Sequence, residues 1–294
     1  MEYTQFGRTG AIVSRIGFGG AVAGLKHYLH DYDPELEENK QKVYRALETA
    51  LDKGITYFDT APGYGNGVSE TLFGHVLGEV DPKTTFLASK CFAFSDDSAI
   101  SDYDAVFRSV EGSLKRLRRD YVDLMQLHGT SYTDAQSERI LGERGAASAL
   151  VQLKKEGVIR YAGFTSEDNN SAVYALMHSG VFDSVQLCYN LIFQHPYEPS
   201  RPFGSLYEAE KLGLGIAVMR VTTSGTFQRW IKSVRPDDTF DYTAALIQFV
   251  LSNPLVDVAL IGMRTPERVL QNIAILEDAA GRIDIDALHS RYVK

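Results

Sequence analysis

Short apolar runs alternate with amphipathic segments along most of the 294-residue chain. The apolar runs are rich in Val, Ile, Leu and Phe, which is typical of strands buried on both faces. We predict strands at residues 16–20, 55–58, 85–90, 122–127, 159–164, 184–187, 216–219 and 256–261. The segments between them repeat apolar residues every three or four positions, which indicates helices that pack one face on a core. We predict helices at residues 37–52, 69–77, 104–117, 147–156, 170–179, 205–212, 242–252 and 266–276.

This alternation amounts to eight strand-and-helix units, which predicts an α/β fold of the closed (β/α)8 TIM barrel type. An open, doubly wound sheet is the structural alternative. Before the first unit, residues 3–6 and 12–14 flank the turn Gly7-Arg8-Thr9-Gly10 and predict a β-hairpin. One barrel accounts for the whole chain, so we expect a single domain over residues 1–294.

Composition narrows the class of protein. Hydrophobic residues make up 44% and charged residues 23% of the chain, as in an ordinary soluble globular protein. The net charge of −8 argues against nucleic acid or an anionic membrane as a general partner. We expect no signal peptide and no membrane span, because no apolar run is long enough. Cys91 and Cys188 lie beside or within apolar strands without metal-ligand spacing, so we expect reduced thiols, no bound metal and a cytoplasmic location.

Four polar residues stand at the ends of successive predicted strands. Asp59 follows the strand at 55–58, and Tyr64 lies in the loop after it. Lys90 ends the next strand, and His128 follows the one after that. The carboxyl ends of parallel strands meet at one edge, so these residues are candidates for one site. A Lys ammonium near a phenol favours the phenolate, and a carboxylate holds the Lys in place. Each residue alone would have an ordinary structural explanation, but the set favours a catalytic site.

At these residues the chain resembles the aldo-keto reductase family. The family pattern is a strand that ends in Asp-Thr-Ala, a Tyr-Gly soon after, a strand that ends in Lys and another that ends in His. The chain has Asp59-Thr60-Ala61, Tyr64-Gly65, Lys90 and His128, in that order. The resemblance continues through residues 67–74, 160–166, 185–186, 261–268 and 271–272.

The resemblance implies a barrel whose bottom is closed by the N-terminal hairpin, and an enzyme that reduces aldehydes or ketones to alcohols with NADPH. In that scheme hydride goes to the carbonyl carbon of a small-molecule substrate, and Tyr64 protonates the oxygen as general acid. Lys90 would pull the pKa of Tyr64 toward neutrality, and Asp59 would anchor Lys90. His128 would hydrogen-bond the carbonyl oxygen and orient it.

The expected cofactor site lies late in the chain. No Gly-x-Gly-x-x-Gly turn follows an early strand, so a Rossmann-type site has no support. Thr265 and Pro266 predict the start of a helix whose free N–H groups, with Arg264 and Arg268, could meet a phosphate. The resemblance implies the 2′-phosphate of NADPH for this segment, and Gln186 for the nicotinamide carboxamide. The expected cofactor residues are Thr165, Ser166, Gln186, Met219, Arg220, Val221, Thr222, Gly262, Arg264, Arg268, Gln271 and Asn272.

Three positions depart from the commoner family pattern. Thr165-Ser166 replaces Ser-Asn at the carboxamide position, and Gly262 replaces a lysine before the phosphate segment. Val221 replaces an aromatic residue that stacks on the nicotinamide, so a weaker apolar contact must serve there. These changes bear on the carboxamide contact and on how strongly NADPH is preferred over NADH.

Two long predicted loops, residues 129–144 and 221–241, follow strand ends, where such loops contact substrate. The second carries Trp230, the only tryptophan, which either borders the substrate or packs the loop down. The aromatic residues that suggest an apolar pocket are Phe92, Phe94, Phe193 and those of the loop from Tyr28 to Tyr32.

Two other functions are compatible with this pattern. Lys90 could be a Schiff-base nucleophile in an aldolase-like barrel, although the order of the four residues disfavours it. The chain could also be a regulatory barrel like the potassium-channel β-subunits, which resemble the reductases in fold and cofactor site and assemble with another protein. The sequence leaves monomer and homo-oligomer open.

Overall fold

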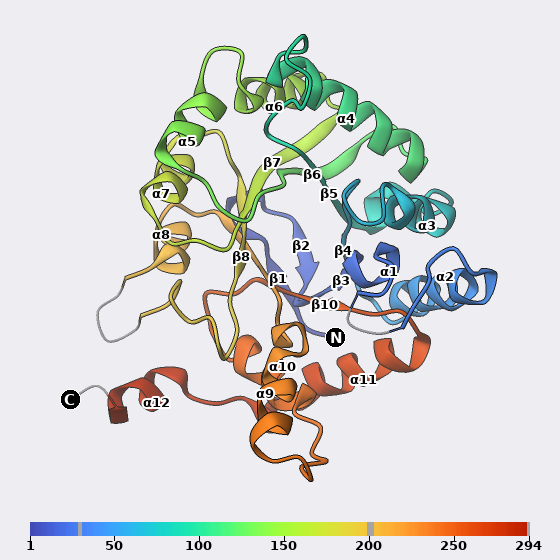
Figure 1. Cartoon of the computed structure of the whole chain (residues 1–294), viewed down its shortest axis with the longest axis vertical. Helices are drawn as coiled ribbons and strands as arrows, with labels where there is room; N and C mark the ends of the chain where they lie inside the picture. Colours follow the sequence, from blue (N-terminus) through green and yellow to red (C-terminus); the bar gives the residue numbers. More distant parts are fainter. Residues whose placement is uncertain (29–30, 199–202, 293–294) are drawn as a thin grey trace.

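The computed structural model describes residues 1–28, 31–198 and 203–292, so residues 29 and 30 of the aromatic loop lie outside the described residues. Parallel strands form a closed barrel in the order β10-β3-β4-β5-β6-β7-β8-β9 (Figure 1). They are β3 (Ile16–Gly19), β4 (Tyr57–Asp59), β5 (Phe86–Cys91), β6 (Val122–Leu127), β7 (Ile159–Ser166), β8 (Ser184–Cys188), β9 (Gly215–Met219) and β10 (Val258–Gly262). The predicted TIM barrel is confirmed, and the open-sheet alternative is wrong.

The predicted helices surround the barrel and alternate with its strands (Figure 1). They are α2 (Glu37–Asp52), α3 (Val68–Leu77), α4 (Asp102–Leu117), α6 (Ala146–Lys155), α7 (Ser171–His178), α8 (Ser205–Lys211), α10 (Thr243–Leu251) and α11 (Pro266–Glu277). In α4, Val106, Val110 and Leu117 are buried on one face. Ser101 begins this helix by accepting a hydrogen bond from the Asp104 N–H. No helix in the described part of the chain is long and apolar enough to cross a membrane.

Several short helices were not expected from the sequence pattern. They are α1 (Ala21–Gly24), α5 (Asp134–Leu141), α9 (Thr226–Val234), α12 (Ile285–Tyr292) and the 3₁₀ turns η1 (Gly7–Thr9), η2 (Pro82–Thr84), η3 (Thr223–Gly225) and η4 (Ala279–Gly281). Helices α5 and α9 fall inside the two segments expected to be irregular loops, so that expectation is wrong. Thr133 and Gln136 form a capping box at the start of α5, a signal that is present in the sequence. Helix α9 buries none of its residues, so no face of it packs into the core.

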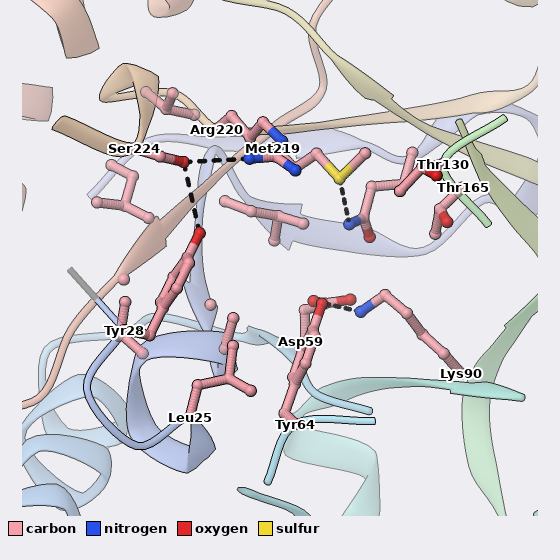
Figure 2. A pocket seen from close by; sticks show the side chains of 18 of the residues that line it. Leu25, Tyr28, Asp59, Tyr64, Lys90, Thr130, Thr165, Met219, Arg220 and Ser224 are labelled. Atoms are coloured by element: carbon pink, nitrogen blue, oxygen red, sulfur yellow. Dashed lines mark hydrogen bonds and ion pairs between the residues drawn. The ribbon is translucent and has the colours of Figure 1, made fainter. Parts of the chain in front are cut away.

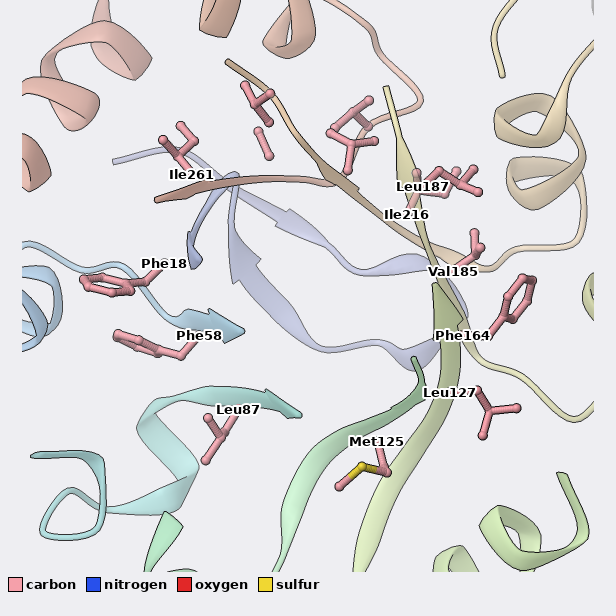
Figure 3. Close-up of a cluster of buried hydrophobic side chains, with 14 of the residues drawn as sticks. Phe18, Phe58, Leu87, Met125, Leu127, Phe164, Val185, Leu187, Ile216 and Ile261 are labelled. Carbon is pink, nitrogen blue, oxygen red and sulfur yellow. The ribbon is translucent and has the colours of Figure 1, made fainter. Parts of the chain in front are cut away.

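Apolar side chains cover both faces of the barrel wall. Phe18, Phe58 and Leu87 are buried between the strands and the helices, and Figure 3 shows them pointing outward from the barrel. A second cluster lies inside the barrel and includes Tyr57 and Phe86. Burial on both faces explains why the strands are nearly continuous apolar runs in the sequence.

The N-terminal hairpin closes one end of the barrel. Its strands β1 (Tyr3–Gln5) and β2 (Ile12–Ser14) pair in antiparallel fashion. Phe6, which follows β1, is fully buried and packs edge-on against Tyr57 and Phe86, with ring centroids 5.5 and 5.4 Å away. Because Tyr57 and Phe86 begin their strands, Phe6 fills the amino-terminal end of the barrel, and the carboxyl ends of the strands form the other, open end.

Candidate active site

The four residues singled out from the sequence meet at the carboxyl ends of β4, β5 and β6. Asp59 is the last residue of β4, Lys90 lies in β5, and His128 directly follows β6. Tyr64 comes from the loop after β4 and points toward Asp59 and Lys90 (Figure 2). All four line one cavity of about 300 Å³. The structure therefore brings the predicted set together.

A glycine shapes the loop that carries Tyr64. Gly65 has a φ of +71°, a left-handed conformation that side chains other than glycine rarely adopt. A Cβ atom at this position would lie 2.1 Å from the Gly24 carbonyl oxygen, so there is no room for one. The Ser69 N–H donates to the Tyr64 carbonyl at 3.1 Å and holds the far side of the turn. The Tyr-Gly pair of the sequence is therefore one structural unit.

Lys90 and Asp59 form a buried ion pair. The Lys90 Nζ atom lies 2.6 Å from Asp59 Oδ1 and 3.0 Å from the Thr60 carbonyl oxygen, and both side chains are almost completely buried. Burial alone would lower the pKa of Lys90, but the nearby Asp59 and Tyr64 outweigh it, so this pKa is raised. Lys90 therefore stays charged at neutral pH. The anchoring of Lys90 by Asp59 agrees with the expectation.

Tyr64 departs from the expected electrostatics. Burial raises the pKa of Tyr64, and the charge of Lys90 offsets this only in part. The Lys90 Nζ atom lies 4.9 Å from the centre of the Tyr64 ring. Lys90 thus acts in the expected direction, but the expected shift of the Tyr64 pKa toward neutrality is wrong for the protein by itself, because desolvation of the phenolate dominates.

His128 is a neutral imidazole at ordinary pH. Burial and the charge of Lys90 lower its pKa to about 3. The ring stacks on Phe92 with centroids 5.8 Å apart and meets the Tyr64 ring edge-on at 5.6 Å. Its Nδ1 atom is buried and has no partner among the described residues. A neutral imidazole carries one N–H, so His128 can donate a hydrogen bond without carrying a charge.

Part of the expected cofactor set lines the same cavity, namely Thr165, Gln186, Met219, Arg220, Val221, Thr222 and Gly262. The Thr165 hydroxyl bonds to the backbone of Gly129. It donates to the Gly129 carbonyl at 2.6 Å and accepts from the Gly129 N–H at 3.0 Å. Ser166 does not line the cavity, and its hydroxyl accepts a hydrogen bond from the Asp168 N–H at 3.0 Å. These two hydroxyls therefore hold the loops at the rim of the cavity.

The remaining expected residues lie at the start of α11 and do not line this cavity. Thr265 caps the helix, because its hydroxyl accepts from the Arg268 N–H at 3.4 Å, and Pro266 follows in the first turn. The predicted helix start is confirmed. The exposed Arg268 guanidinium donates to Gln271 Oε1 at 2.7 Å. Arg268 and Gln271 therefore form one polar surface on the first turns of α11.

Two side chains beside this surface hold unpartnered polar atoms. Asn272 is completely buried, yet neither its Nδ2 nor its Oδ1 has a partner in the described part of the chain. The Arg264 guanidinium lies 4.2 Å from the centre of the Tyr32 ring, and its Nη1 atom is buried without a partner. Each such atom costs about 1–3 kcal/mol. These residues therefore fit a polar ligand that supplies the missing partners.

Two contacts across the cavity mouth were not foreseen from the sequence. The Tyr28 and Ser224 hydroxyls lie 3.4 Å apart and join the segment before α2 to η3 (Figure 2). Arg220 pairs with Glu167 at 2.7 Å and joins the ends of β9 and β7. No sequence signal links these pairs, because their members are far apart in the chain.

A second cavity of about 470 Å³ adjoins the first at His128, Gly129 and Thr130. Its other lining residues are Phe92, Ala93, Phe94, Asp96, Ser131, Tyr132 and Gln136. Asp96 is the only acidic residue in its lining, which contains no Lys or Arg. The expected pocket aromatics Phe92 and Phe94 belong to it. Phe193 and Trp230 line neither of the two cavities, and Trp230 is 56% exposed on α9.

Comparisons with known proteins agree with this fold. The chain matches the aldo/keto reductase family over residues 15–241, which is most of its length, and it belongs to that family. Membership of this family makes the chain an oxidoreductase.

Individual relatives are distant but nearly collinear with the chain. It is 27% identical to L-galactose dehydrogenase of Arabidopsis thaliana, over 95% of this chain and 89% of that protein. It is also 27% identical to the aldo-keto reductase YhdN of Bacillus subtilis, over 90% and 86%. A holo-form aldo-keto reductase of Bacillus halodurans superposes with a TM-score of 0.75 at 22% identity, over 99% and 96%. An aldo-keto reductase of Klebsiella pneumoniae in complex with NADPH superposes with a TM-score of 0.71 at 23% identity, over 98% of this chain and 93% of that chain. At these identities the structures show the shared fold alone.

Proposed function

We propose that the chain interconverts an aldehyde or ketone and the corresponding alcohol with NADP(H), and that Tyr64 is the general acid of the reduction. The observation that carries the proposal is the buried Lys90–Asp59 pair beside Tyr64, with the neutral His128 on the same cavity. A phenol, a cation and a neutral N–H donor are the groups needed to orient a carbonyl oxygen and to protonate it. Family membership supports the choice of cofactor.

In this mechanism bound NADPH supplies the hydride that reduces the carbonyl carbon. The residues of the chain act on the oxygen. Tyr64 gives its proton to the alkoxide as it forms, and the nearby ammonium of Lys90 stabilises the phenolate that remains. Asp59, at 2.6 Å from Lys90, keeps this ammonium charged and in place. His128 donates its N–H to the carbonyl oxygen and orients it.

Two groups of residues would hold NADP(H). At the strand ends, Gln186 would bind the nicotinamide carboxamide, and the cavity-lining residues from Met219 to Thr222, with Gly262, would contact the rest of this half. Thr165 and Ser166 would act through the loops that they hold. At α11, the adenosine and its 2′-phosphate would lie against Arg264, Arg268, Gln271 and Asn272. The unpartnered atoms of Arg264 and Asn272 support this choice.

The substrate would occupy the second cavity. This cavity meets the first at His128, so a carbonyl group held there leaves room for the rest of the molecule between Phe92, Phe94 and α5. The aromatic rings suit an apolar or aromatic portion. Because Asp96 is the only charged lining residue, the cavity favours neutral or cationic substrates over anionic ones.

The test is NADPH consumption with a panel of aldehydes and ketones, measured for the wild type and for Tyr64→Phe, with NADPH binding measured in parallel by fluorescence. Turnover by the wild type that is lost in the variant, with NADPH binding intact in both, supports the proposal. An active Tyr64→Phe enzyme would overturn the role of Tyr64.

One observation favours the regulatory-barrel alternative. Helix α9 exposes Trp230 by 56% and Val234 by 80%, an apolar surface of the kind that a protein partner covers. Tight NADPH binding without turnover of any carbonyl in the panel would favour this alternative over the enzyme.

A further inference from the structure

Gln126, in β6, joins two parts of the candidate site. Its side chain is completely buried and lines neither of the two cavities. Its Nε2 atom lies 3.2 Å from Asp59 Oδ2 and 3.3 Å from Gln186 Oε1. The other carboxylate oxygen of Asp59, Oδ1, is taken by Lys90. One amide group therefore touches both the carboxylate of the ion pair and the side chain expected to meet the nicotinamide.

The surroundings of Gln126 fix the direction of its amide. Both atoms that it faces are oxygen acceptors, so the NH₂ group must point toward them; a reversed amide would set its own oxygen against the Asp59 carboxylate. The side-chain oxygen of Gln126, Oε1, has no partner in the described part of the chain, so the two donated hydrogen bonds alone orient the amide group. On the neighbouring strand β7, Gly163 leaves the space for this side chain, because a Cβ there would lie 3.2 Å from Gln126 Cγ.

The contact with Gln126 also decides which side of the Gln186 amide faces the first cavity. Gln186 lines this cavity and turns its oxygen toward Gln126. Its Nε2 lies 3.5 Å from the Met219 sulfur, which is a weak acceptor. The N–H groups of Gln186 are therefore the part offered to a ligand, and they match a carbonyl oxygen rather than an amino group.

We propose that Gln126 is a positioning residue that holds the Asp59 carboxylate for Lys90 and turns the Gln186 amide so that its N–H groups face the cofactor. The inference rests on the proposed function. Gln126 reaches the reaction only through Asp59 and Gln186, so its two effects can be measured separately.

The first effect is on the pH dependence of turnover. The titratable groups that face Asp59 are Lys90 from β5, Tyr64 from the following loop and Tyr57 from the same strand, and only Lys90 is a cation. Burial raises the pKa of Asp59, whereas Lys90 and the hydrogen bond from Gln126 oppose this rise. Loss of the Gln126 donor therefore raises the Asp59 pKa further. Since turnover needs Asp59 ionised, the acid limb of kcat moves to higher pH.

The second effect is on cofactor binding. Without Gln126, the Gln186 amide is free to turn over, and one oriented hydrogen bond to the cofactor is lost part of the time. Gln126→Met keeps the length of the side chain and removes both donors. We expect it to weaken NADPH binding by about 2- to 10-fold, the range for one neutral hydrogen bond. The acid limb of kcat should move up by about half a pH unit or more, because a lost hydrogen bond to a charged group has at least this effect.

A double-mutant cycle separates the two effects. In a Gln186→Leu background, Gln126→Met should no longer change NADPH affinity, while the shift of the acid limb should persist. An equal change in NADPH affinity in both backgrounds would show that Gln126 does not act through Gln186. Gln126→Glu, nearly the same shape, is the second variant: its carboxylate faces Asp59, so the acid limb should move further than in Gln126→Met.

Gln248→Met is the matched control. Gln248, in α10, is also a buried amide; it donates to the Ile275 and Asp278 carbonyls at 2.6 and 2.9 Å and lines neither of the two cavities. The Gln248→Met change should lower the melting temperature and leave both the NADPH affinity and the acid limb of kcat unchanged. If Gln126→Met and Gln126→Glu retain the wild-type pH profile and NADPH affinity, the proposal is overturned. A wild type that binds NADPH and reduces nothing would instead refute the proposed function.

Discussion

The strand-end half and the α11 half of the proposed cofactor site differ in how far their polar groups are already satisfied. At the strand ends, Lys90 and Asp59 are almost fully buried and satisfy each other at 2.6 Å. At α11, Asn272 is just as deeply buried, yet its two polar atoms have no partner among the described residues. The first half is assembled before any ligand arrives, whereas the second depends on a ligand for its contacts. Changes at Tyr64, Lys90 and Asp59 should therefore alter rate more than affinity, and changes at α11 should alter affinity.

Among changes at the strand ends, Tyr64→Phe should have the largest effect on activity. It removes only a hydroxyl, so the fold and NADPH binding should survive while aldehyde reduction falls by about 10²–10⁴-fold, as for other lost general acids. Burial raises the Tyr64 pKa, so the wild-type rate should fall on the alkaline side only above the usual range of a phenol. Residual activity of the variant should lack this limb. Steady-state rates across pH, beside NADPH titrations, check both statements, and a limb near neutrality would contradict the second.

Lys90→Met tests the ion pair as a structural element. It leaves Asp59 buried without its cation, so we expect the free energy of unfolding at pH 7 to fall by about 3–5 kcal/mol. The folded-state pKa of Asp59, which burial already raises in the wild type, then rises further, so the loss is fully present above the variant's folded-state pKa and shrinks as pH falls through it. Urea unfolding of the variant and the wild type at several pH values measures this. A loss that stays constant from neutral to acidic pH would show that Asp59 does not carry the charge.

Arg268→Ala tests the α11 half at its surface. The guanidinium is exposed and bonds only to Gln271 among the described side chains, so stability should hardly change. Loss of a charge-assisted contact with the 2′-phosphate should weaken NADPH binding by at least about tenfold and leave NADH binding nearly unchanged. Titrations with both cofactors decide the matter, and an equal loss for the two would count against Arg268 as the phosphate contact.

Asn272→Leu should change stability and affinity in opposite directions. The apolar side chain removes two buried, unpartnered polar atoms, so the cofactor-free protein should gain about 1–3 kcal/mol in its free energy of unfolding for each of them, while NADPH binds less tightly. Asn190→Leu is the control, because Asn190 is equally buried but donates to the Arg220 carbonyl at 3.0 Å, and its loss should destabilise. Thermal unfolding with and without NADPH measures both variants. A destabilised Asn272→Leu protein would mean that these atoms are satisfied in solution.

The sequence was informative where chemistry follows chain order. In a parallel barrel every strand ends at the same rim, so an Asp, a Lys and a His at successive strand ends had to approach one another, and Asp59, Lys90 and His128 do. The cap at Thr265 was equally local and was predicted. Helix α5 could have been predicted from the pair Thr133 and Gln136.

Other features depend on how distant parts of the chain pack together, so they could not be predicted from the sequence. The pKa of Tyr64 follows from how much water the surrounding elements exclude, so the effect of Lys90 alone predicted the wrong net direction. The contact of Tyr28 with Ser224 joins segments that only the closed barrel brings together. Gln126 reads as one more residue of an apolar strand, and its contacts with Asp59 and Gln186 come from two other strands.

The packing of Phe6 at the amino-terminal end of the barrel has a consequence for how ligands reach the site. Phe6 packs against Tyr57 and Phe86, and the buried cluster that these three residues share fills the amino-terminal end of the barrel. Cofactor and substrate would therefore both bind and leave at the carboxyl end, where the two cavities adjoin. If either departure is slower than the chemical step, it sets a ceiling on the turnover rate however fast that step becomes.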